Sequence, residues 1–189
     1  MTKVYFVRHA DADNSVQDEM VRPLSEKGRR DCALVTEFLR DKNINAVLSS
    51  PYRRAVDTIF DFAKSVNQPI QIVNDFREGK LSDVWVEDFK AVYEKQWADF
   101  NCKLPDGESL AEVQARNIAA LTGVLKAYQG KIIAIGTHGA ALSTIINYYD
   151  RTFGFEDFVA IANVKPWVVI MDFLDDGSVG IEKIDLFRL

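Results

Sequence analysis

Short runs of strand-forming residues alternate with helix-like segments along most of the chain, and this alternation limits the folds open to it. Strand-like runs at 3–7, 45–49, 69–73 and 131–136 are separated by segments in which apolar residues recur with helical spacing. Strands that alternate with helices predict an α/β fold in which a mostly parallel sheet is covered by helices on both faces. We therefore predict a three-layer sandwich, formed as a single domain over residues 1–189.

Capping signals place the predicted helices more closely. Ser50 and Pro51 are typical of an N-cap and a first helical residue, and Ser109 with Glu112 forms the pattern of a capping box. The predicted helices span 25–42, 50–65, 84–99, 109–128 and 138–149. A Gly-containing turn at 175–178 predicts a hairpin between strands at 166–173 and 179–187.

The stretch from 74 to 106 interrupts the alternation of strands and helices. It is polar and carries aromatic residues at roughly helical spacing, namely Trp85, Phe89, Tyr93, Trp97 and Phe100. We interpret it as an inserted lid or small subdomain with one helix, and the aromatic stripe as a packing face.

Both histidines of the chain fall where two predicted strands end. Arg8 and His9 end the first strand, and His138 follows the strand at 131–136. Arg54 lies four residues after Ser50, at the end of the second strand. Ligands of parallel sheets bind beyond the carboxyl ends of the strands, so we expect these side chains to converge.

Two arginines and two histidines at one edge predict a site for a dianion. Arginine offers bidentate, charge-assisted hydrogen bonds that suit phosphate, and we expect the free N–H groups of two helix N-termini to face the same region. A metal site is not predicted, because two histidines far apart in sequence do not supply a ligand pattern.

Composition excludes several other classes of protein. The net charge is −5 without a block of basic residues, which argues against nucleic acid as a partner. No apolar run approaches the roughly 18 residues of a membrane span. Cys32 and Cys102 form no metal or redox motif and are interpreted as separate thiols. Charge appears too early in the sequence for a signal peptide, so we expect a cytoplasmic protein.

Six segments, in order, resemble motifs of the histidine phosphatase superfamily, which includes the phosphoglycerate mutases. They are Val7-Arg8-His9-Ala10, Pro23–Gly28, Leu48–Thr58, Phe76-Arg77-Glu78, Asp106–Ser109 and Ile135–Gly139. Singly these matches are weak, but together they cover most of the chain. Ala10 departs from the family pattern by replacing a glycine, and we expect its methyl group to narrow the phosphate pocket.

The resemblance implies a metal-independent phosphatase that needs no cofactor and acts on small phosphorylated metabolites. His9 would be the nucleophile and form phosphohistidine, with its second ring nitrogen donating to a backbone carbonyl. Arg8, Arg54 and a protonated His138 would hold the phosphoryl oxygens. Glu78 would protonate the leaving oxygen and then activate water.

Further substrate contacts are predicted on the same basis. Asn14 takes the place of the family's phosphate-contacting asparagine, with Ser15 as the other choice, and Gly139 follows the second histidine.

Three other readings remain open at this point. A cofactor-dependent phosphoglycerate mutase uses the same site, but the segment 79–108 is short and its only cations are lysines. A non-catalytic phosphate-binding module would be expected to lack a histidine or arginine of the site. A protein-phosphohistidine phosphatase would need an open site. The natural substrate and the oligomeric state are not predicted.

Overall fold

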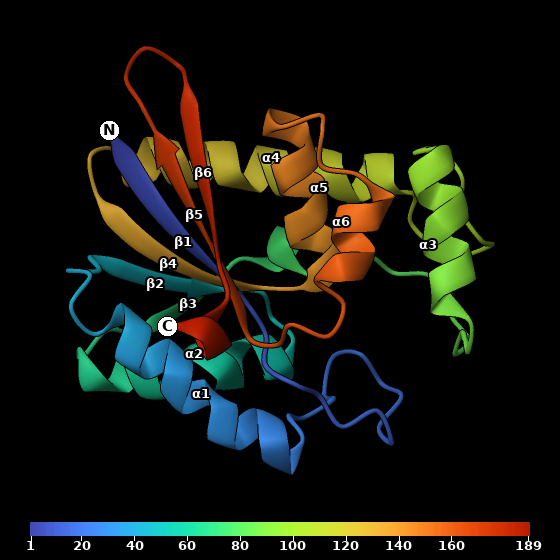
Figure 1. The fold of residues 1–189 in the computed structure, drawn as a ribbon, viewed down its shortest axis with the longest axis horizontal. Helices are drawn as coiled ribbons and strands as arrows, with labels where there is room; N and C mark the ends of the chain where they lie inside the picture. Colours follow the sequence, from blue (N-terminus) through green and yellow to red (C-terminus); the bar gives the residue numbers. More distant parts are fainter.

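The computed structural model describes all 189 residues and contains one mixed sheet of six strands (Figure 1). The strands are β1 (Thr2–Arg8), β2 (Ala46–Ser49), β3 (Ile70–Ile72), β4 (Ile132–Thr137), β5 (Trp167–Phe173) and β6 (Val179–Ile184). Their order across the sheet is β3-β2-β4-β1-β5-β6. The neighbours from β3 to β1 are parallel, whereas β5 runs antiparallel to both β1 and β6. The predicted α/β fold with a mostly parallel sheet is confirmed.

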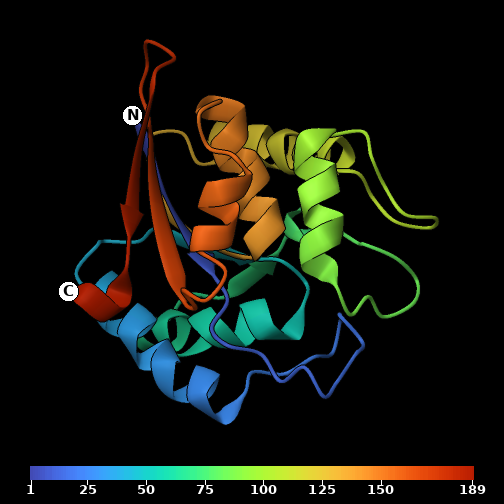
Figure 2. The same ribbon diagram turned by 45° about the vertical axis from the view of Figure 1, so that its right-hand side comes forward.

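Helices cover both faces of this sheet. They are α1 (Glu26–Leu39), α2 (Arg53–Ser65), α3 (Phe89–Ala98), α4 (Leu110–Ala127), α5 (Gly139–Tyr149) and α6 (Phe155–Ala160). In Figure 1, α1 and α2 lie below the sheet while α4 and α5 lie above it. Figure 1 shows α6 next to α3 at the right of the molecule, and in the turned view of Figure 2 α3 lies on the side away from the β5–β6 hairpin.

Alternating side chains of the central strands build two hydrophobic cores. Val4 and Phe6 of β1 face α4 and α5 in a cluster of 16 buried residues, and Tyr5 and Val7 face α1 and α2 in a cluster of 12. Burying one large apolar side chain stabilises the fold by about 1.5–3 kcal/mol, so β1 is held firmly from both sides. The residue that follows β1 is therefore fixed in space by its strand.

Local capping explains where most helices begin. Ser25 accepts a hydrogen bond from the N–H of Gly28, and Ser109 and Glu112 form the predicted capping box of α4. The predicted start of α2 at residue 50 was wrong. This helix begins at Arg53, with Tyr52 at its N-cap. Ser50 instead continues the sheet, since its N–H donates to Gly136 of β4.

The helix of the inserted segment is shorter than predicted, and it packs against a second helix. This helix, α3, begins at Phe89, where the Asp88 side chain caps it, and not at residue 84. The short helix α6 was not predicted. Aromatic side chains from the two helices and the adjoining loops form one cluster, which includes Tyr93, Trp97, Phe100, Phe153 and Phe158. The prediction that the aromatic stripe is a packing face holds for Tyr93 and Trp97, whereas Phe89 is exposed.

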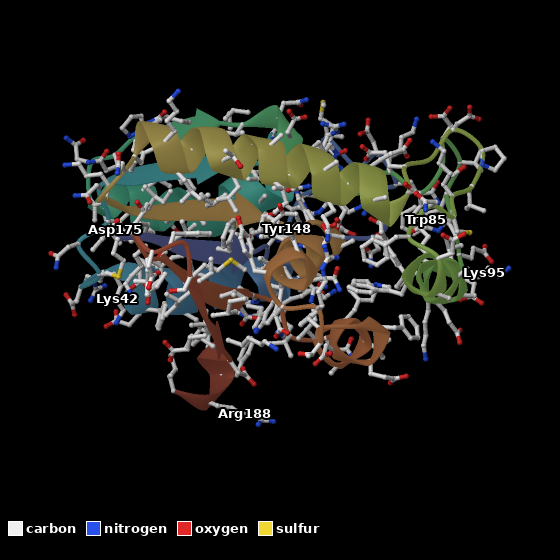
Figure 3. All side chains as sticks on the ribbon, turned by 90° about the horizontal axis from the view of Figure 1, so that it is seen from above. Lys42, Trp85, Lys95, Tyr148, Asp175 and Arg188 are labelled. Atoms are coloured by element: carbon white, nitrogen blue, oxygen red, sulfur yellow. The ribbon has the colours of Figure 1, made fainter.

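Trp85 lies outside this cluster, in the loop before α3. The guanidinium of Arg22 packs over its ring, 5.0 Å from the centroid. In Figure 3, Trp85 and Lys95 mark the end of the molecule formed by the inserted segment, and Asp175 in the β5–β6 turn marks the opposite end. The inserted segment is thus joined to the loop that follows β1.

Candidate active site

Three neighbouring strand ends deliver the candidate residues to one place. Arg8 is paired with Thr137 across β1 and β4, and Ser49 with Gly136 across β2 and β4. The pairing of β1 with β4 continues one residue further, because the N–H of His9 donates to Thr137 O at 3.0 Å. The rings of His9 and His138 meet edge to face with centroids 5.3 Å apart. The sequence-based expectation that both histidines converge is therefore met.

His9 is held as a neutral ring whose Nε2 is the unprotonated nitrogen and accepts a hydrogen bond from Arg54. Its Nδ1 lies 2.7 Å from the carbonyl oxygen of Ala10, and a carbonyl oxygen can only accept, so Nδ1 carries the proton. Nε2 accepts a hydrogen bond from Nε of Arg54 at 3.2 Å. Burial, followed by the charges of Arg54 and Arg8, places the pKa of His9 well below its ordinary value. The ring is thus prepared to act as a nucleophile through Nε2.

Arg54 is the most buried cation of the site, with 2% of its surface exposed. Besides His9, its guanidinium contacts Glu19: Nη1 donates to the Glu19 carbonyl at 2.7 Å and Nη2 to the carboxylate at 2.6 Å. The second carboxylate oxygen of Glu19 pairs with Nη1 of Arg22 at 2.7 Å. The carboxylate and carbonyl of Glu19 therefore take both terminal nitrogens of the Arg54 guanidinium.

His138 is fully buried between His9 and Tyr52. Its Nε2 lies 2.7 Å from the hydroxyl of Ser50, its Nδ1 has no hydrogen-bond partner, and its ring meets that of Tyr52 at 5.1 Å between centroids. Burial, then the charges of Arg54 and His9, place the pKa of His138 well below its ordinary value. His138 is therefore neutral here, and the protonated form expected from the sequence would require the charge of a bound dianion.

Arg8 is buried beside the histidines, but its guanidinium donates hydrogen bonds to backbone carbonyl oxygens. Its guanidinium donates to the carbonyl oxygens of Ile161, Ala162 and Val164, while its Nε is buried without a partner. Burial, partly offset by the charge of Glu78, lowers the pKa of Arg8 to about 10, so it remains a cation at neutral pH.

Gly139 lies directly against this guanidinium. A Cβ atom at residue 139 would stand 3.1 Å from Nη2 of Arg8, closer than side chains usually approach. The structure thus gives Gly139 a contact with Arg8, while its predicted contact with substrate stays a prediction.

Glu78 fills the N-terminal end of α5. Its carboxylate accepts hydrogen bonds from the N–H groups of Gly79, Ala140 and Ala141 at 2.9–3.1 Å. This corrects the expectation that the first N–H groups of α5 are free for phosphate, since Glu78 already takes two of them. The position places the half-buried Glu78 at the first turn of α5, the helix whose N-cap is His138.

Two further predictions concern the loop that follows β1. Asn14 and Ser15 are exposed, the Ser15 hydroxyl donates to Asp13 at 2.7 Å, and no hydrogen bond joins either residue to His9, Arg54 or His138. The methyl group of Ala10 does not narrow the phosphate pocket as expected, because it packs with Leu24 and Cys32 in a small buried cluster.

Sequence reasoning missed four residues that line the site, namely Glu19, Arg22, Tyr52 and Tyr93. Tyr52 follows the Ser-Ser-Pro segment and is the one with a usable signal, since it adjoins a predicted strand end. Glu19, Arg22 and Tyr93 come from the loop after β1 and from the inserted segment, so their approach depends on how these segments fold back.

Two general features of the chain bear on its class. No group of three or more His, Cys, Asp or Glu side chains has a geometry that could hold a metal ion. No helix has the length and apolar character required to cross a membrane.

Comparison with known proteins gives one family and several relatives. The model of the histidine phosphatase superfamily (branch 1) matches residues 4–178. The uncharacterized phosphatase PhoE of Bacillus subtilis is 27% identical over 150 residues, which covers 77% of this chain and 76% of that protein. The probable phosphoglycerate mutase GpmB of Yersinia pestis is 29% identical over 161 residues, covering 78% and 74%.

Solved structures share the same fold. A phosphoserine phosphatase from Entamoeba histolytica, solved with phosphoserine, superposes with a TM-score of 0.80 at 18% identity and covers 100% of both chains. At this identity the likeness concerns the fold alone.

Proposed function

We propose that this chain, which belongs to the histidine phosphatase superfamily (branch 1), hydrolyses phosphomonoesters of small metabolites through a phosphohistidine at His9. The observation that carries the proposal is the state of His9. Its Nδ1 donates to Ala10 and its Nε2 lone pair is directed at the Arg54 guanidinium. A nucleophile and the cation that binds its target are thus adjacent.

In the proposed first step, Nε2 of His9 attacks phosphorus and the bond to the ester oxygen breaks. The electron pair of that bond goes to the leaving oxygen, which takes a proton from Glu78. Arg54, released from Glu19, and Arg8, through its unpartnered Nε, neutralise the equatorial oxygens. In the second step water attacks phosphorus and loses a proton to Glu78, the P–N bond breaks with its electron pair returning to Nε2 of His9, and inorganic phosphate leaves.

Glu78 must change its hydrogen bonds to play this part. Both of its oxygens accept backbone N–H groups in the unliganded site, so one of them has to be released before the side chain reaches a leaving oxygen. Its place at the first turn of α5, the helix that His138 caps, supports the role, and the release is a motion of one side chain.

The cations of the inserted segment favour hydrolysis over transfer between two hydroxyls. A mutase has to hold the carboxylate of its substrate, but Lys80 pairs with Asp83 and Lys103 pairs with Glu112, while Lys90 and Lys95 are exposed on α3. None of these lysines contacts the candidate active site. The retained histidines and arginines favour catalysis over simple phosphate binding.

The test is phosphate release from p-nitrophenyl phosphate in EDTA by the wild type and by His9→Ala. We expect metal-independent turnover in the wild type and a loss of at least about 10³-fold in the variant, because covalent catalysis through His9 is removed. Acid-labile, alkali-stable phosphate on the quenched wild-type protein would identify the intermediate. Thermal unfolding of both proteins checks that the variant is folded.

Other results point elsewhere. Turnover that requires added metal, or that survives in His9→Ala, would contradict the phosphohistidine mechanism. A wild type that is inert with the ester but interconverts phosphoglycerates when bisphosphoglycerate is added would be a mutase.

A further inference from the structure

The ion pair of Glu108 and Arg116 forms none of the hydrogen bonds around His9 and His138, and it binds the backbone that leads to Glu78 instead. Glu108 and Arg116 form a bidentate pair, with Nε to Oε1 at 2.7 Å and Nη2 to Oε2 at 2.8 Å. Both side chains are largely buried at the start of α4. Burial raises the pKa of Glu108, but its hydrogen bonds from Arg116 and Lys80 outweigh this, and the net shift is downward. The pair is therefore ionised and well formed at neutral pH.

The remaining donors of Arg116 hold the backbone that leads to Glu78. Nη1 donates to the carbonyl oxygens of Asp75 and Arg77 at 2.8 Å, and Nη2 donates to that of Glu78 at 3.0 Å. A single guanidinium thus fixes three carbonyls within four residues. Its planar fork allows this pattern, which the ammonium of a lysine could not reproduce.

Glu108 holds the other side of the same segment. Its carboxylate accepts the N–H of Lys80 at 3.1 Å and a hydrogen bond from the Arg77 side chain, and its own N–H donates to the Lys80 carbonyl at 2.6 Å. Gly107 permits the close approach, because a Cβ there would lie 2.1 Å from the Leu81 carbonyl oxygen. The segment Gly107-Glu108-Ser109, which resembles a family motif, thus has a structural role.

We infer that Glu108 and Arg116 are positioning residues for Glu78, and that they hold its carboxylate at the end of α5 beside the site. This inference rests on the proposed role of Glu78 as acid and base. The segment 75–81 carries only a short 3₁₀ turn, Asn74–Phe76, so the pair supplies the rigidity that a strand or helix would otherwise give.

The test compares variants on a series of aryl phosphates with leaving groups of increasing pKa. Glu108→Gln and Arg116→Lys should slow kcat for phenyl phosphate by about 10–100-fold, part of the 10²–10⁴-fold that a positioned acid contributes. With p-nitrophenyl phosphate, whose leaving group needs little protonation, kcat and KM should change less than about threefold.

Glu112→Gln provides the matched control. It makes the same chemical change four residues further along the chain, in the first turn of α4, and removes an ion pair of similar length, that of Glu112 with Lys103 at 2.7 Å. A Gln also keeps the capping box, so the dependence on leaving group should match that of the wild type.

A double variant separates positioning from a general loss of structure. If Glu108 acts through Glu78, adding Glu108→Gln to Glu78→Gln should slow phenyl phosphate hydrolysis by less than about twofold. Additive losses, or equal slowing of all leaving groups, would overturn the inference while leaving the His9 mechanism intact. A wild type without His9-dependent turnover would remove the proposed function, and the inference with it.

Discussion

At the scale of single residues, the site is a set of buried charges arranged around two neutral histidines. Burial and the arginines lower the pKa of His9 and His138 alike, so neither ring adds to the positive charge of Arg8 and Arg54. The only carboxylate that touches Arg54 is that of Glu19. A phosphate bound at Arg54, as we propose, would have to compete with Glu19 for the same donors.

Replacing Glu19 by glutamine should tighten the binding of inorganic phosphate. The side chain of Glu19 is 46% exposed, so its pair with Arg54 is screened and we expect a gain of about 0.5–1 kcal/mol, or two- to fivefold in Kd. Isothermal titration with phosphate measures this without relying on turnover. Asp18→Asn, a change at the neighbouring exposed acid, serves as the control. Unchanged or weaker binding in Glu19→Gln would mean that the carboxylate supports the site.

At the scale of elements, signals between residues close in sequence were dependable. The capping box of α4 and the turn of the hairpin depend on contacts within a few residues, and the structure has both where they were predicted. The start of α2 was misplaced because a pairing with β4, far away in sequence, holds Ser50 in the sheet. The missed helix α6 is short and stabilised by packing on α3, which no local pattern reveals.

The candidate active site shows the same difference between residues placed by local signals and residues placed by contacts distant in sequence. His9, Arg54 and His138 could be located because each follows a buried strand, and the order of parallel strands brings their ends together. Glu19 and Arg22 could not, because their ion pairs depend on the path of an exposed loop. The hydrogen bonds of Glu78 to α5 were equally hidden, since they join segments distant in sequence.

Removing the capping box of α4 should destabilise the protein without altering the chemistry of His9. Ser109→Ala leaves the N–H of Glu112 without its acceptor, and we expect a loss of about 1 kcal/mol in the free energy of unfolding. Thr122→Ala on the same helix is the control, because Thr122 is exposed and alanine favours a helix. Urea denaturation measures both. Equal stabilities of the two variants would show that the cap contributes little.

At the scale of the whole molecule, the buried neutral histidines connect catalysis to stability. A histidine whose pKa is lower in the folded state than in the unfolded chain contributes stability above the unfolded value of about 6.5. Below that pH the unfolded chain binds more protons, and the contribution is lost. The chain contains no other histidine, so this effect belongs to the active site.

We therefore expect the free energy of unfolding to fall between pH 7.5 and 5.5. One pH unit below 6.5, each buried neutral histidine costs about 1.4 kcal/mol, or about 3 kcal/mol for the two. Urea denaturation at the two pH values measures the change. His138→Asn should show roughly half of it, since one titrating ring remains. A wild-type stability that does not change over this range would contradict the lowered pKa values.

The order of strands in the sheet has a consequence for how the protein is made. β1, which leads to His9, lies between β4 and β5, and both are synthesised long after it. Until residue 173 has left the ribosome, the largely buried strand β1 has an unpaired edge, and His9 lacks part of the surroundings that it has in the folded protein. The nascent chain must keep this strand from pairing with other chains until β5 has been made, so the edge of β1 is covered at the same stage of folding that completes the surroundings of His9.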